Sequence, residues 1–300
     1  MKKIKLRIND KTTAQDFYPN RTAIIIIDVW DDHWCKYYKE LNDKLAPKIG
    51  AFVEKARQAG MTIIHAPCSS RKKVSTLPEY KIHSCMPYYS DHQARKNALS
   101  SPRRPNQTQP PRLADRCQRP NDIFFKGVKH SRKDKFCTCV PFCDRSWPRP
   151  WNRQHDAISV SNKDYVSDNL KEIEYILYDE QIHRIFCVGG ALNACLIDRP
   201  ISMHAVYKNI YSNFIRDLTA SHLPRDEVFN ISPMDADSHH WHGRELRAKF
   251  KNLASKYDVP LQGHNQVLTY DAAHEIQSKY IEEKMCPSIL SKELLDACTP

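Results

Sequence analysis

The segment Ala23–Asp28, which reads Ala-Ile-Ile-Ile-Ile-Asp, constrains the fold of this chain more than any other. Four consecutive isoleucines are typical of a parallel strand that is covered by helices on both faces of its sheet. A stretch at 41–59 with apolar side chains on one helical face follows and ends before Gly60, and a second apolar run covers 61–66. Strand, helix and strand in this order predict a βαβ unit.

The same alternation returns in the second half of the chain. It predicts strands at 157–160, 184–188 and 210–215, helices at 168–178 and 193–207, and a last helix at 271–284. Residues 287–290 either add a final strand or pack as a tail. We therefore predict one α/β domain over residues 1–300, with a three-layer, doubly wound and largely parallel sheet.

A long, proline-rich and basic insertion at about 69–155 should separate the two halves. Its stretch from Arg95 to Arg153 holds 15 Lys or Arg and four acidic residues, an excess of 11 that equals the net charge of the whole chain. The rest of the chain is therefore neutral, and we do not expect nucleic acid or a membrane as a partner. A solvated insertion is favoured over one that binds phosphates, although it could also cover the site, mediate assembly or steer an anionic substrate.

The cysteines and the hydropathy indicate a cytoplasmic protein. No run of about 18 apolar residues is present, and the basic opening residues precede no apolar signal segment. Eleven cysteines, an odd number, are scattered along a long chain, so we expect most of them to be reduced thiols. We predict no metal site, because Cys137, Cys139 and Cys143, with Cys117 upstream, lack the paired spacing of strong zinc sites, and the His-rich segment 238–242 favours a polar loop.

Three ionisable residues follow predicted strands, where open α/β sheets bind their ligands. Asp28 closes the first strand, Lys163 lies just beyond 157–160, and Cys195 follows 184–188 across a Gly-Gly-Ala-Leu turn. A helix starting near Asn193 would favour the Cys195 thiolate. Each residue alone is more typical of a cap, a solvated side chain or a core thiol. Together they favour a nucleophilic cysteine with a proton acceptor and a cation beside it.

The stretch Gly189–Cys195 resembles the G-x-x-x-N-x-C nucleophile turn of the isochorismatase-like cysteine hydrolases, a family that includes nicotinamidases and other small amidases. Ile24–Asp28 is similar to the opening strand of that family, and Lys163, 32 residues before the cysteine, lies close to where the family places its lysine. The resemblance covers most of the chain. Further segments look like a longer branch of the family, mostly of unassigned substrate: Asp28–Cys35, Cys137–Cys143, Trp151–His155, Arg199–Pro200, Arg216–Thr219 and Tyr280–Ile289.

The departures from the family pattern concern three positions. Trp30 stands where many members have glutamine, so the substrate should pack differently there. Cys68–Lys72 replaces the Asp-x-His motif of metal-dependent nicotinamidases, which argues against nicotinamide as the substrate. Gly190 replaces a β-branched residue beside a peptide bond that is commonly cis, which would leave the turn looser.

The resemblance implies a hydrolase that cleaves a small-molecule amide or related C–N bond without a cofactor. Asp28 would take the proton of Cys195, Lys163 would stabilise the thiolate and orient Asp28, and the backbone N–H groups of Ala191 and Cys195 would hold the oxyanion. Trp30, Trp34 and His65 are expected to bind the substrate, and the protein is expected to be a homo-oligomer. The alternatives are an isochorismatase-type vinyl-ether hydrolase and a non-catalytic binding protein that retains the fold.

Overall fold

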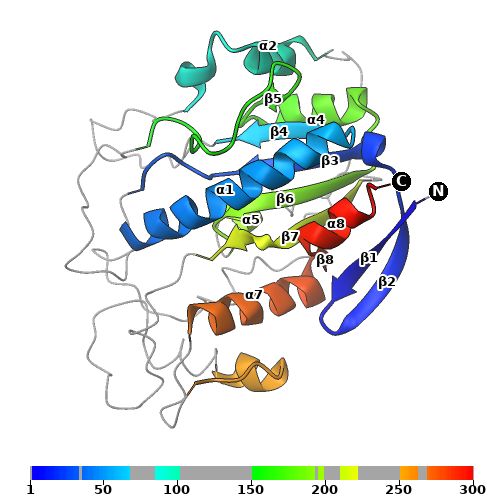
Figure 1. Cartoon of the computed structure of the whole chain (residues 1–300), viewed down its shortest axis with the longest axis vertical. Helices are drawn as coiled ribbons and strands as arrows, with labels where there is room; N and C mark the ends of the chain where they lie inside the picture. The colour runs from blue at the N-terminus through cyan, green and yellow to red at the C-terminus, as the bar shows by residue number, and fades with distance from the viewer. Residues whose placement is uncertain are drawn as a thin grey trace.

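The computed structural model describes residues 2–33, 36–67, 85–101, 151–192, 195–198, 210–221, 251–262 and 269–299 (Figure 1). Its strands are β1 (Lys2–Ile8), β2 (Lys11–Phe17), β3 (Thr22–Ile27), β4 (Thr62–Ala66), β5 (Tyr165–Val166), β6 (Arg184–Gly190), β7 (Tyr211–Ala220) and β8 (Ser288–Ile289). Its main helices are α1 (Lys36–Gln58), α2 (Gln93–Ser100), α4 (Leu170–Asp179), α5 (Cys195–Asp198), α7 (Tyr270–Lys284) and α8 (Ser291–Asp296), with short 3₁₀ turns at Pro19–Arg21 and Met86–Tyr89.

The described strands form one sheet in the order β2-β1-β8-β7-β6-β3-β4-β5. The strands β5, β4, β3, β6, β7 and β8 run parallel, and only the hairpin of β1 and β2 adds antiparallel pairs. From β3 the chain winds outward to β4 and β5, and it then returns to β6 on the other side of β3. The predicted doubly wound, largely parallel α/β fold is therefore confirmed, and its switch point lies between β3 and β6.

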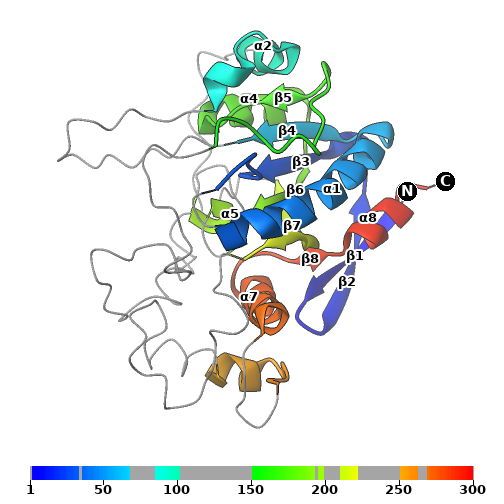
Figure 2. The same cartoon turned by 60° about the vertical axis from the view of Figure 1, so that its left-hand side comes forward.

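Helices cover both faces of this sheet, as the alternation of side chains in β3 requires. Ile24 and Ile26 share one core with side chains from α1 and α8. Ile25 and Ile27 share a second core with side chains from α2, α4, α5 and α7. All four isoleucines are fully buried, and Figure 2 shows α1 crossing in front of β3 and β6. The predicted three layers are thus present, and the sequence Ile-Ile-Ile-Ile supplies both cores.

One predicted strand is wrong, and this error has a consequence for the site. Residues 157–160 form no strand: a turn at 156–157, closed by the N–H of Ile158, which donates to the carbonyl of His155 (3.0 Å), is followed by a bend and irregular chain. Their side chains alternate between exposed and more buried positions and so imitate a strand. The strand that pairs with β4 is β5, Tyr165–Val166, which begins after Lys163 instead of ending before it.

The ends of the described chain complete the sheet. The β1–β2 hairpin, which was not predicted, turns at Asn9 in a left-handed conformation (φ 54°). The final strand, one of two alternatives for 287–290, is present as β8. The two termini lie side by side in Figures 1 and 2. The Lys2 ammonium donates to the carbonyl of Cys298 (2.7 Å). Among the described residues, no helix combines the length and the apolar character of a membrane span.

Candidate active site

Asp28 lies at the switch point of the sheet. It directly follows β3, whose last residue Ile27 is opposite Gly189 of β6. Asp28 is fully buried and adopts a left-handed backbone conformation (φ 52°), which ends the extended strand. Aspartate tolerates this conformation better than most residues, and buried outliers of this kind concentrate at functional sites. The carboxylate therefore stands where α/β sheets bind ligands, as the sequence predicted for this residue.

The end of β6 approaches Asp28 through two glycines, and each is required by a close contact. Gly189 has φ +108°, and a Cβ atom there would lie 2.1 Å from the carbonyl oxygen of Ile27. A Cβ atom on Gly190 would lie 1.8 Å from the hydroxyl oxygen of Tyr38 on α1. The Gly190–Ala191 peptide bond is cis, as the family resemblance implied. Side chains are excluded at both positions, so the backbone of β6 packs directly against Ile27 and Tyr38.

The turn after β6 delivers Cys195 to the same edge. The N–H of Leu192 donates to the carbonyl of Ala220 (2.7 Å), and the N–H of Leu196 donates to the carbonyl of Ala191 (3.1 Å). Cys195 is the first residue of α5 and is half-buried. The N–H groups of Ala191 and Cys195 stay the predicted oxyanion donors, and residues 193 and 194 lie outside the described part of the chain.

Cys195 packs against a group of side chains that we call the tryptophan cluster, formed by Trp30, Cys85, Tyr89, Ala94, Trp151 and Val166. The rings of Trp30 and Trp151 stack with their centroids 4.3 Å apart. Residues 151–155 reach this place by pairing with the chain beyond β3, because the N–H of Asp31 donates to the carbonyl of Arg153 (3.0 Å) and the N–H of His155 to that of Val29 (2.9 Å). The two tryptophan-containing segments of the family resemblance therefore meet beside the cysteine.

The other described thiols are less suited to act as nucleophiles. Cys187 is fully buried inside β6, and this burial raises the pKa of its thiol to about 12. Cys85 and Cys286 are buried as well. Burial also raises the pKa of the half-buried Cys298 thiol. Because the thiolate is the reactive form, Cys195 is the best-placed described cysteine at the carboxyl edge of the sheet.

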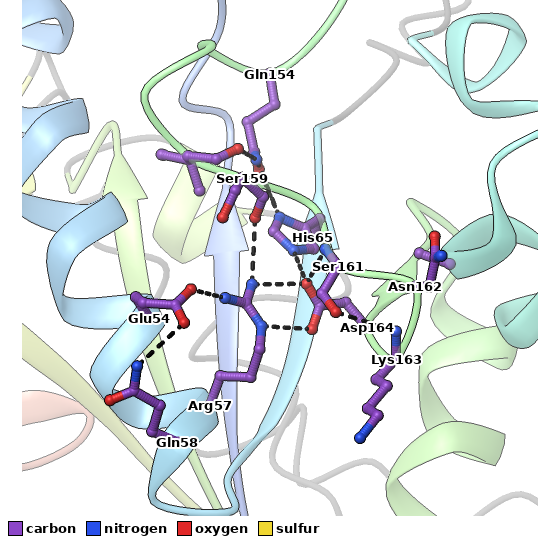
Figure 3. Close-up of polar contacts among 12 residues, drawn as sticks. Glu54, Arg57, Gln58, His65, Gln154, Ser159, Ser161, Asn162, Lys163 and Asp164 are labelled. Carbon is purple, nitrogen blue, oxygen red and sulfur yellow. Dashed lines mark hydrogen bonds and ion pairs between the residues drawn. The ribbon is translucent and has the colours of Figure 1, made fainter.

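Lys163 is not brought together with Asp28. Tyr165 pairs with Ile64 of β4, which itself pairs with Ile25, so Asp28 lies three residues beyond the level of Tyr165, about 10 Å along the strand. Lys163 precedes Tyr165 and so lies toward the opposite end of the sheet. Its side chain is exposed, and Figure 3 shows it directed away from the neighbouring polar network. The strand expected before Lys163 is absent, and the role of Lys163 as the catalytic lysine stays a prediction.

The polar network next to Lys163 is centred on Asp164, which the sequence did not single out (Figure 3). Its carboxylate accepts hydrogen bonds from Arg57 Nη2 (2.8 Å), His65 Nε2 (3.0 Å) and the N–H of Ser161 (2.7 Å). Burial acts to raise the pKa of Asp164, but the hydrogen bonds from His65 and Arg57 outweigh it and lower that pKa below 3.8. The network ties the end of α1 to β4 and to the chain before β5.

Of the two predicted substrate-binding residues that the structure describes, Trp30 lies beside the proposed nucleophile and His65 does not. His65 is fully buried, with Nδ1 3.1 Å from Gln154 Oε1 and Nε2 bound to Asp164, so neither nitrogen is open to a substrate. The role predicted for His65 is therefore corrected to a structural one. Trp34 lies outside the described residues. The candidate zinc and histidine clusters, Cys117, Cys137, Cys139, Cys143 and 238–242, lie outside them too, and within them no three His, Cys, Asp or Glu side chains form a group suited to a metal ion.

Comparisons with known proteins give similarities of structure only. No protein-family model matches this chain, and no curated protein matches its sequence. A cysteine hydrolase from Pseudomonas syringae pv. phaseolicola is similar over 99% of this chain and 98% of its own, with 14% identity and a TM-score of 0.46. A putative isochorismatase from Burkholderia xenovorans is similar over 93% and 89%, with 13% identity and a TM-score of 0.42. A putative isochorismatase hydrolase from Oleispira antarctica is similar over 94% and 100%, with 11% identity and a TM-score of 0.41.

Because these identities are 11–14% and these TM-scores lie below 0.5, the function must be argued from the residues of this chain. Its own structure has an open, doubly wound α/β sheet, and at the switch point of that sheet stand a buried aspartate and a glycine turn that leads to a half-buried cysteine.

Proposed function

We propose that this protein is an isochorismatase-like cysteine hydrolase that cleaves a C–N bond of a small molecule, with Cys195 as nucleophile and Asp28 as proton acceptor. The observation that carries the proposal is the placement of Asp28 and of the turn leading to Cys195 on neighbouring strands, with Ile27 opposite Gly189. In open α/β sheets, ligands bind at the carboxyl ends of two adjacent strands whose following connections run to opposite sides of the sheet. The sequence resemblance of Gly189–Cys195 to the nucleophile turn of that family supports the same reaction.

The reaction would proceed in two stages. Asp28 takes the proton from the Cys195 thiol, and the thiolate attacks the carbonyl carbon, so that a C–S bond forms and the negative charge moves to the oxygen. The N–H groups of Ala191 and Cys195 would hold this oxyanion. The C–N bond then breaks as Asp28 returns the proton to the leaving amine.

The second stage releases the acid and restores the enzyme. A water molecule gives its proton to Asp28 and adds to the thioester carbon, after which the C–S bond breaks and Cys195 regains its proton from Asp28. The chemistry needs no cofactor. Asp28 is fully buried and Cys195 half-buried, so the substrate would reach the sulfur from its exposed side and shield the reacting atoms from bulk water.

The tryptophan cluster favours a compact substrate with a planar group. Trp30 and Trp151 are 6% and 2% exposed, so the wall that they form beside Cys195 is apolar and closely packed. A flat amide or ureide would fit such a wall with little loss of rotational freedom. The small-molecule partner, its charge and the homo-oligomeric state stay predictions of the sequence.

Turnover by matched variants tests the proposal. The intact protein is assayed against a panel of small amides, ureides and vinyl ethers, beside Cys195→Ser and Asp28→Asn. We expect hydrolysis of an amide or ureide, and a loss of about 10³-fold or more in kcat for each variant, because the nucleophile and its proton acceptor act as a unit. Turnover of vinyl ethers alone would assign the alternative hydrolase reaction.

A different outcome would reject the enzyme altogether. If the whole panel gave no turnover, and the protein bound RNA or DNA with a steep salt dependence that Cys195→Ser left intact, the chain would be a binding protein. Near-ultraviolet circular dichroism of each variant checks that the fold is preserved.

A further inference from the structure

A series of buried hydrogen bonds connects the network at Asp164 with the tryptophan cluster beside Cys195. Its central residue is His65 on β4, which is fully buried, and Gln154 beside it is 3% exposed. His65 Nε2 lies 3.0 Å from Asp164 Oδ2, and Nδ1 lies 3.0 Å from the amide nitrogen and 3.1 Å from the amide oxygen of Gln154. Figure 3 shows the imidazole between the carboxylate and the amide, so both of its nitrogens are bonded to other parts of the chain.

These contacts fix the Gln154 amide in one orientation. The Asp164 carboxylate also accepts from Arg57, so it acts as an acceptor and Nε2 of His65 donates to it. In the neutral ring Nδ1 then accepts. The amide nitrogen of Gln154 gives one hydrogen to Nδ1 and the other to the carbonyl of Ile158 (3.2 Å). Because a buried amide without partners is costly, this orientation is strongly held.

The backbone of Gln154 carries this fixed position into the tryptophan cluster. Gln154 forms an antiparallel bridge with Trp30. Its N–H donates to the hydroxyl of Tyr89 (3.0 Å), which is another member of the cluster. Trp151, three residues earlier in the same segment, stacks on Trp30 at an interplanar angle of 14°. Gln154 is therefore bonded to two members of the cluster, and its segment supplies a third.

The same network connects the cluster with the strands that position Asp28. His65 on β4 is opposite Ile26 of β3, two residues before Asp28. The N–H of His155 donates to the carbonyl of Val29 (2.9 Å), directly after Asp28. The segment 151–155 is thus held on one side by its backbone and on the other by the bond between Gln154 and His65. A change at His65 should reach the cluster through Gln154.

We propose that His65 and Gln154 are positioning residues for substrate recognition, which hold the tryptophan cluster so that it selects a flat group next to Cys195. This inference rests on the proposed function and adds the residues that set its specificity. His65 acts through Gln154, and Gln154 acts through the backbone of 151–155, so neither side chain touches the substrate. Recognition groups that are locked by supporting hydrogen bonds discriminate more sharply than loosely held ones, and stacking depends closely on geometry.

Two alkylating reagents of nearly equal size test the selection of a flat group. N-phenyliodoacetamide carries a planar ring, whereas N-cyclohexyliodoacetamide carries a puckered one. The rate constant of Cys195 labelling by each reagent is measured near pH 7 in the full-length protein by peptide mass spectrometry. The ratio of the two constants is divided by the same ratio for glutathione. A change in the reactivity of the thiol itself cancels in this phenyl preference, which therefore reports the surroundings of the sulfur.

The unmodified protein should show a phenyl preference of about fivefold or more, which is in the range that aromatic pairs contribute. Gln154→Leu keeps the approximate volume of the side chain and removes its amide. It should reduce the preference to about twofold or less. A purely structural role would lower the stability of the variant but leave the preference unchanged in the folded protein, which near-ultraviolet circular dichroism identifies.

Two substitutions of His65 separate the two bonds of its ring. His65→Asn places an amide near the position of Nδ1 and can keep the bond to Gln154. His65→Gln places an amide near the position of Nε2 and can keep the bond to Asp164 instead. The phenyl preference should therefore fall in His65→Gln, as in Gln154→Leu, and should largely remain in His65→Asn. Because Gln154→Leu and His65→Gln remove the same bond from its two sides, one folded variant of the two is sufficient.

His155→Gln is the matched control in the same segment. The ring of His155 bonds to Asp43 (3.3 Å) and to the N–H of Ala157 (3.1 Å). Its loss should leave the phenyl preference unchanged, because the bond between His65 and Gln154 is kept.

Three results would overturn the proposal. They are an unmodified protein without a phenyl preference, a preference that survives both Gln154→Leu and His65→Gln, and equal losses in His65→Gln and His65→Asn, which would indicate disturbed packing in place of the bond to Gln154. Selective labelling of Cys195 in any of these cases would leave it as the nucleophile. A Cys195 that neither reagent labels ahead of the other described thiols would instead reject the proposed function itself.

Discussion

The hydroxyl oxygen of Tyr38 occupies the position that a side chain on Gly190 would need, since a Cβ atom there would lie 1.8 Å away from it. Tyr38 is 2% exposed and belongs to the core between α1 and the sheet. The missing side chain at Gly190 therefore does not leave the turn loose, because Tyr38 fills the space. The family that this chain resembles has a β-branched residue at the position of Gly190. Tyr38 on α1 takes the space of that side chain, which explains why glycine stands there.

Gly190→Ala should destabilise the fold by about 2 kcal/mol, because the buried Tyr38 ring must move to admit a methyl group. The free energy of unfolding in urea measures the effect. Tyr38→Phe removes the oxygen at 1.8 Å and leaves the ring carbon at 3.0 Å, so Gly190→Ala should cost clearly less in that background. Equal costs in the two backgrounds would contradict the steric explanation.

Lys163→Met should leave kcat/KM within about twofold of the unmodified protein, because Lys163 is exposed and lies before β5. A lysine that stabilised the thiolate would instead be worth about 10²-fold or more. Lys171→Met, at an exposed position early in α4, is the matched surface control. A large loss for Lys163→Met alone would return the lysine to the site.

Asp164→Asn should lower the stability at pH 7 by about 3 kcal/mol, because it removes the charge that Arg57 and His65 share in the interior. The pKa of Asp164 is lowered in the folded state, so its contribution is complete above the unfolded value of 3.8 and is lost as the pH falls through the folded value. Urea unfolding at several pH values should show a constant difference from pH 7 to 5 that shrinks below 3.8. Asp156→Asn, which breaks a surface pair with Arg153, should have little effect, and an equal loss there would contradict the importance of burial.

His274 predicts a second loss of stability as the pH falls, at a higher pH than that of Asp164. Its Nε2 lies 3.1 Å from the hydroxyl of Thr219, and burial together with the Arg216 charge lowers its pKa from 6.5 to about 4. The unfolded chain therefore binds a proton before the folded protein does, and the fold loses about 2 kcal/mol as the pH falls from 6.5 to 4. His274→Gln should remove this loss, so its stability relative to the unmodified protein should rise between pH 7 and 4.5. A pH-independent difference would show that His274 does not titrate in this way.

The central strands could be predicted because their signal is local. The isoleucine run of β3 and the apolar run of β6 are buried on both faces, and the helix at α1 has an apolar stripe that ends before Gly60. The hairpin was missed because β2 is almost entirely exposed and lacks apolar alternation. Residues 157–160 were mistaken for a strand because the apolar Ile158 and Val160 alternate with a serine there without belonging to a sheet.

Residues of the site could be predicted only where the local sequence pattern beside them is clear. Asp28 and Cys195 each follow a clear strand, so their placement after two neighbouring strands follows from the order of the sheet. Asp164 and His65 are 99 residues apart, and their hydrogen bond depends on how β4 and the chain before β5 are packed. Trp30 and Trp151 stack beside Cys195 although they are far apart in the sequence, so local periodicity could not predict their contact.

The order in which the cysteines are alkylated tests the central claim, that Cys195 is the nucleophile, most directly. The protein is treated with limiting iodoacetamide near pH 7, and the labelling of its eleven cysteines is compared with the turnover that remains. We predict that Cys195 is labelled first, that turnover falls in proportion, and that Cys187, whose thiol pKa is about 12, is among the last. Labelling of Cys137 or Cys143 first, with Cys195 inert, would contradict the account.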